Sequence, residues 1–65
     1  MSAPAARPAS VLTAIDAAIE HCRRARLGLE SDTADTPRGP QRGILLEVIG
    51  GLLSIEGRLE KLRAA

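Results

Sequence analysis

Residues 44–62 read ILLEVIGGLLSIEGRLEKL, and this stretch decides the fold. Its apolar residues recur every three or four positions, which is the spacing of one face of an α-helix. Pro40, just before the stretch, suits the first position of such a helix. The spacing therefore predicts a helix over about 40–63, with these residues on its main apolar face: Leu45, Val48, Leu52, Ile55, Leu59 and Leu62.

An earlier stretch of the chain has the same period. Ser10 is a suitable N-cap residue, and Gly28 is suited to ending a helix, so we expect a first helix over about 11–28. Residues 1–9 are rich in Ala and Pro and are expected to form a disordered leader, whereas about 29–39 are dense in turn formers and are expected to form a loop. The apolar face of the first helix would comprise Leu12, Ile15, Ile19, Cys22 and Leu29, with Arg26 as its one charged member.

The two expected helices match each other when they are placed antiparallel. One constant register, with the turn centred on residue 37, pairs Leu12 with Leu62, Ile15 with Leu59, Ile19 with Ile55, Cys22 with Leu52, Arg26 with Val48 and Leu29 with Leu45. Six pairs in one register predict an all-α antiparallel hairpin over 10–65. In this arrangement Arg26 must either extend to solvent or find a carboxylate.

Apolar residues remain outside that face. Leu46, Ile49 and Leu53 form a second stripe on the second helix, and Ala18 belongs to a stripe of small residues on the first. Gly50, inside the second helix, suits close approach of another backbone. A stripe without a partner in one hairpin indicates an interface, so we expect self-association into a four-helix bundle, or coiled-coil-like helical oligomer, through Leu46, Ile49, Leu53, Ala18 and Gly50.

Composition excludes several classes of function. The chain has 65 residues with one His, one Cys and no aromatic residue. These cannot furnish a nucleophilic catalytic set or a zinc site, so we expect no enzyme activity, no metal and no cofactor. A net charge of +1 without aromatic side chains argues against nucleic acid as a partner. No apolar run is long enough for a membrane span, and a cytoplasmic protein with a free thiol is the default expectation.

One cluster of arginines could bind an anion. Arg38, Gln41 and Arg42 lie at the start of the second helix, where free N–H groups and the helix dipole attract negative charge. The hairpin would also bring Arg23 and Arg26 towards this end. The alternative is that the acidic residues of the loop, Glu30, Asp32 and Asp35, simply neutralise these arginines.

Two functional hypotheses follow. The first is a non-enzymatic, homo-oligomeric helical interaction module that serves as an adaptor, inhibitor or assembly protein. The second is a small binding protein that captures a phosphorylated or nucleotide ligand at an arginine-lined junction between subunits. The expected partner is a second copy of the chain, with a protein partner or phosphorylated small ligand as a further candidate.

Overall fold

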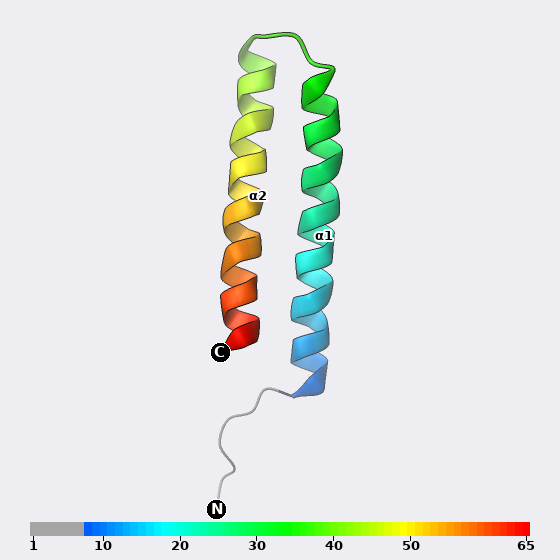
Figure 1. Cartoon of the computed structure of the whole chain (residues 1–65), viewed down its shortest axis with the longest axis vertical. Coiled ribbons are helices and arrows are strands. Elements are labelled where there is room, and N and C mark those ends of the chain that lie inside the picture. The colour runs from blue at the N-terminus through cyan, green and yellow to red at the C-terminus, as the bar shows by residue number, and fades with distance from the viewer. Residues whose placement is uncertain (1–7) are drawn as a thin grey trace, which may run out of the picture.

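The computed structural model describes residues 8–65, and within them the chain forms two long helices joined by a short loop (Figure 1). Helix α1 spans Ala9–Ala34 and helix α2 spans Pro40–Ala64. The helices lie side by side, run antiparallel and pack against each other, and the described residues contain no strand. This confirms the predicted all-α hairpin of two helices. Of the predicted leader, residues 1–7 lie outside the described residues, and Ala9 already belongs to α1.

Helix α1 is longer than its sequence predicts, because it continues through Gly28 to Ala34. Gly28 keeps an ordinary helical conformation, since Gly39 alone among the described glycines has a positive φ. The extra turns bring Leu29, already predicted on the packed face, into α1 and add the buried Thr33 to that face. The Thr33 hydroxyl donates to the carbonyl oxygen of Leu29 at 2.7 Å, so its burial leaves no polar group unsatisfied. The expected loop over 29–39 therefore shrinks to the five residues 35–39.

The reversal of the chain depends on Gly39. Its backbone has φ 154° and ψ −175°, a region that is almost closed to residues with a Cβ atom. Pro40 follows as the first residue of α2, as predicted, and the Gly43 N–H donates to the Gly39 carbonyl oxygen at 3.1 Å. Gly39 therefore fixes the direction in which α2 leaves the loop.

The inner face of α1 is the one that the sequence predicts. Ile15 and Ile19 are buried, and the other predicted positions on that face are half-buried: Leu12, Cys22, Arg26 and Leu29. On α2, Leu45, Leu52 and Leu59 are half-buried as predicted.

The other half of the predicted α2 face is wrong. Val48, Ile55 and Leu62 are 45%, 46% and 43% exposed, while Ile49 and Glu56 are only 8% and 6% exposed and take their place against α1. At about 100° per residue, this difference corresponds to a rotation of α2 by about 50° about its axis. Ile49 therefore belongs inside the hairpin, and its assignment to an outer stripe is also wrong.

Polar pairing explains this rotation. One row on α2 has a residue at every seventh position and faces α1 and the loop: Arg42, Ile49, Glu56 and Arg63. Arg42 donates to the Thr36 carbonyl oxygen, Glu56 accepts from Arg26, and Arg63 donates to Asp16. The predicted orientation would bury more aliphatic surface but would leave Arg26 against Val48. In that orientation Arg26 would keep only Glu30, the carboxylate of its own helix, and the loss of a bidentate partner by a partly buried guanidinium costs more than one aliphatic contact contributes.

The packed interior is small. Among the described residues, three apolar side chains are buried, namely Ile15, Ile19 and Ile49, and none is completely shielded from solvent. Neither of the two helices offers an apolar segment of the length that a bilayer crossing requires, within residues 8–65.

Candidate interaction surface

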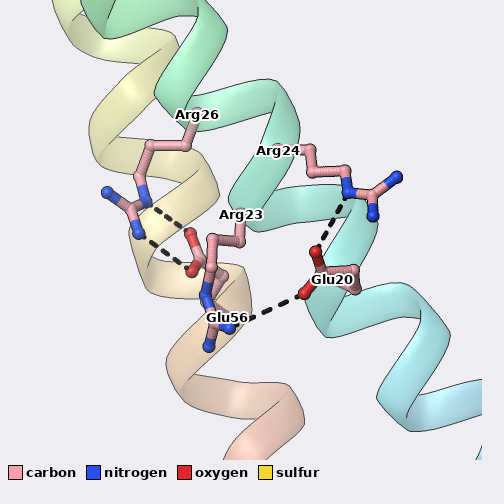
Figure 2. Close-up of polar contacts among 5 residues, drawn as sticks. All are labelled: Glu20, Arg23, Arg24, Arg26 and Glu56. Carbon is pink, nitrogen blue, oxygen red and sulfur yellow. Dashed lines mark hydrogen bonds and ion pairs between the residues drawn. The ribbon is translucent and has the colours of Figure 1, made fainter.

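The centre of the hairpin is held by a charged cluster around Arg26 (Figure 2). Nε of Arg26 donates to Oε2 of Glu56 at 2.7 Å, and its Nη2 donates to Oε1 of the same carboxylate at 3.3 Å. The remaining nitrogen, Nη1, donates to Oε1 of Glu30 at 2.8 Å. The side chains of Arg26 and Glu56 are only 17% and 7% exposed. A bidentate pair with so little exposure fixes the rotation of one helix against the other.

The pairing also sets the protonation of its members. Hydrogen bonding from Arg26 lowers the pKa of Glu56 below its ordinary value, against the opposing effect of its burial. Hydrogen bonds to Glu56 and then to Glu30 raise the pKa of Arg26 above its ordinary value. Both groups therefore stay charged at neutral pH, and their role is to join the helices.

Further ion pairs surround this cluster on the same side of the hairpin. Glu20 accepts from Nε of Arg24 at 3.0 Å and lies 3.6 Å from Nη1 of Arg23 (Figure 2). Near the open end of the hairpin, Arg63 donates to Asp16 across the two helices. We call this side the charged face and define it by Glu20, Arg23, Arg26, Glu30 and Glu56.

The predicted anion-binding residues are divided. Arg23 and Arg26 are paired with carboxylates of the charged face and do not join Arg38 and Arg42. Arg38 and Gln41 are exposed, while Arg42 is half-buried and its Nη1 donates to the Thr36 carbonyl oxygen at 3.3 Å. An open hollow at the start of α2 is lined by Arg38, Gly39, Arg42, Gly43 and Leu46. The structure thus leaves two of the four predicted arginines at this end of the hairpin.

The predicted interface residues are divided as well. Leu46 and Leu53 are 53% and 50% exposed, and Gly50 is exposed, but Ile49 is packed inside the hairpin. On α2, the side chains of Leu46 and Leu53 lie about 90° from the inner face in one direction, whereas those of Ile44, Val48 and Ile55 lie about 90° from it in the other.

Helix α1 is divided in the same way. Glu20, Arg23 and Glu30 lie to one side of its inner face, and Val11, Ala18 and Ala25 lie to the other. In a hairpin of two antiparallel right-handed helices, side chains that are displaced from the inner face in the same rotational sense lie on the same side of the hairpin. Leu46 and Leu53 therefore share a side with the charged face. Ala18 lies on the opposite side, with Val48 and Ile55.

That opposite side forms an aliphatic face. We define it by the large residues Ile44, Val48 and Ile55 and by Gly51 on α2, and by Val11, Ala18 and Ala25 on α1. Ile44 is 60% exposed and Val11 is 40% exposed. All seven positions are apolar or glycine, and the row of Val11, Ala18 and Ala25 continues along α1 to the exposed Asp32. Sequence reasoning missed this face because it placed Val48 and Ile55 inside the hairpin.

Glu56 was missed for the same reason. A signal for it was present, since Arg26 needs a carboxylate and Glu56 lies seven residues after Ile49 and four after Leu52 on the same helical face.

Comparison of the chain with known protein families, with curated proteins and with solved structures finds no match.

Proposed function

We propose that this chain is a non-enzymatic helical interaction module that acts as a homo-oligomer, in the form of a four-helix bundle or a larger helical assembly. Such a module would serve as an adaptor, inhibitor or assembly protein. The observation that carries the proposal is the exposure of large aliphatic side chains on α2: Ile44, Leu46, Val48, Leu53 and Ile55 are each 45–60% exposed.

The balance of burial supports association. Within residues 8–65, three buried apolar side chains form a small core. Full burial of an aliphatic side chain contributes about 1.5–3 kcal/mol, so covering the exposed half of each exposed aliphatic side chain would add about 1 kcal/mol per residue. The three of these residues that share one side of the hairpin, Ile44, Val48 and Ile55, would together add about 3 kcal/mol, a large fraction of the stability of a small domain.

The polar groups support a structural role for the charged face. Every charged group at the centre of the hairpin is bonded to a group of opposite charge, and the described residues contain no buried side-chain nitrogen or oxygen atom without a partner. A catalytic or ligand-binding centre keeps some polar groups available for its substrate. We propose the cytoplasm as the setting, where Cys22 would remain a free thiol.

Sedimentation equilibrium over a hundredfold range of concentration tests the proposal. We expect a mass of at least two chains at high concentration. Circular dichroism should show a melting temperature that rises with concentration, because association stabilises the folded state by mass action. A monomer that melts at one temperature over the whole range contradicts the proposal.

The hollow at Arg38 and Arg42 favours a second candidate function, the capture of a phosphorylated or nucleotide ligand. Helix α2 has no side-chain cap at its first turn, so backbone N–H groups there stay available to an anion. Leu46 also lines the hollow, so an association that covers Leu46 would place it at a junction between subunits.

Thermal shift with tripolyphosphate tests this second function. Stabilisation of the parent, and its loss on replacement of Arg38 and Arg42 by Ala, would support it. Arg24→Ala with Lys61→Ala removes the same charge from other exposed positions and should leave the shift unchanged. An equal loss in both double variants would show that only net charge matters and would contradict a site.

A further inference from the structure

The aliphatic face carries an inference that rests on the proposed homo-oligomer and names its interface. We infer that a second copy of this chain docks on the aliphatic face, with α2 antiparallel to α2 of the second copy and a two-fold axis passing close to Leu52. The charged face would then remain on the outside of the resulting bundle.

The size of the face fits this occupant. Helix α2 has 25 residues. At about 1.5 Å per residue it is about 37 Å long, and two helices of about 10 Å diameter side by side present roughly 700 Å². Stable interfaces bury about 800 Å² per partner. A second hairpin of equal length would cover Ile44, Val48 and Ile55 together.

The arrangement of residues along α2 is that of a self-complementary surface. A two-fold axis pairs each residue with one equally far beyond the axis. The midpoint between Val48 and Ile55 and the midpoint between Glu47 and Arg58 lie on either side of Leu52. One axis there brings Val48 to the level of Ile55 of the second copy, and at the same time Glu47 to the level of its Arg58.

The charges at the edge of the face support the same axis. Glu47 and Arg58 are both exposed, and no ion pair within the described residues includes either of them. They are eleven residues apart on one helix. That separation is about 16 Å along the axis, so they cannot reach each other within one chain. Between two copies related by the axis they form two equivalent pairs of opposite charge.

Gly51 lies next to the axis, on the aliphatic face. A Cβ atom added there would meet no other atom within 4 Å, so packing inside the hairpin does not require glycine at this position. A glycine near the crossing point of two helices allows their backbones to approach closely. Gly51 therefore gains a role in the dimer that it lacks in one hairpin.

Matched aspartate variants test the face. Ile55→Asp places a charge on the aliphatic face, and Leu53→Asp places the same charge two residues away, on the side of the charged face, at nearly equal exposure in the hairpin. We expect the dimer dissociation constant to rise at least about 100-fold for Ile55→Asp and less than about threefold for Leu53→Asp. Sedimentation equilibrium measures both.

The outcomes separate the inference from the proposed function. The reverse pattern, with dissociation by Leu53→Asp alone, overturns the inference and leaves the homo-oligomer standing. A monomeric parent overturns both. Equal dissociation by both variants also overturns the inference, because it shows that the two sides of the hairpin contribute alike.

Charge exchange tests the two-fold axis without disturbing the aliphatic residues. Glu47→Arg and Arg58→Glu should each weaken dimerisation by about 2–10-fold, and the double variant should restore the parent value. Combining Glu60→Arg with Arg58→Glu gives the same net charge without the pairing, and should not restore it. Because Glu47 and Arg58 cannot meet in one chain, specific rescue can come only from contact between copies. Absence of rescue, or rescue by the control, overturns the proposed axis.

Discussion

The two sides of the hairpin differ in whether contacts within one chain satisfy their side chains. On the charged face, Arg26, Glu30 and Glu56 satisfy one another, and Arg23 and Glu20 extend the pattern. On the aliphatic face, Ile44, Val48 and Ile55 stay about half exposed. Polar pairing therefore decides how the helices meet, because a partly buried charge that loses its cross-helix partner costs more than an aliphatic side chain left in water.

The largest expected effect follows from leaving the charged face incomplete. Glu56→Ala removes the main partner of Arg26, and we expect the melting temperature to fall by roughly 10 °C or more at fixed concentration. Replacing both residues together, Arg26→Met with Glu56→Leu, should restore most of the loss, because no buried charge then lacks a partner and the carboxylate of Glu30 is exposed to solvent. Circular dichroism measures both variants. An unchanged melting temperature for Glu56→Ala would show that the pair does not hold the helices together.

The orientation of the two faces can also be disturbed from the loop. Gly39→Ala places a Cβ atom at φ 154°, and we expect a cost of about 1–3 kcal/mol. The matched control is Gly43→Ala in the first turns of α2, where a Cβ atom meets nothing within 4 Å and helix propensity favours Ala. Thermal melting should place the two variants on opposite sides of the parent. Equal stability for both would show that the loop tolerates another conformation.

Acid should weaken the charged face selectively. The pKa of Glu56 lies below its ordinary value of 4.5, so in acid the unfolded chain binds the proton more readily than the folded chain. Its contribution is therefore complete above about pH 5 and is lost as the pH falls through the lowered pKa. The melting temperature of the parent should fall more steeply between about pH 5 and about pH 2 than that of Glu56→Gln. Parallel profiles would contradict a specific role for this carboxylate.

The smallest effect is expected at the open end of the hairpin. Arg63 and Asp16 also pair across the helices, but their side chains are 56% and 51% exposed. Asp16→Asn should cost less than about 1 kcal/mol and should lose even that in high salt. A loss as large as that of Glu56→Ala would mean that exposure does not distinguish the two cross-helix pairs. Denaturant unfolding at low and high salt measures the difference.

Much of the fold could be predicted from apolar spacing alone. The period identifies both helices, the start of α2 at Pro40 and the inner face of α1. The end of α1 could not be predicted, because Gly28 permits either a cap or a continued helix, and packing of Leu29 and Thr33 favours continuation. Residue preferences at helix ends describe only neighbouring positions along the chain, so they cannot predict packing of Leu29 and Thr33 against the other helix.

The candidate surface could be predicted less well. Either of two rows on α2 can complete an inner face that contains Leu45, Leu52 and Leu59. One row contains Val48 and Ile55, the other contains Ile49 and Glu56, and the first is the more apolar. Choosing between them requires the cost of burying Arg26 without a carboxylate from α2, which depends on both helices together. The same error placed Ile49 outside and left the aliphatic face unseen.

The loop of five residues has a kinetic consequence. Because the connection is short, the two helices of one chain find each other quickly. Helical chains of low contact order fold in microseconds to milliseconds. Encounters between chains are slower, at about 1–100 per second for a 10 µM solution. Each chain would therefore reach its hairpin equilibrium many times before it meets another. Assembly after a jump from denaturant should accordingly show a fast phase independent of concentration, followed by a second-order phase whose half-time halves when the concentration doubles.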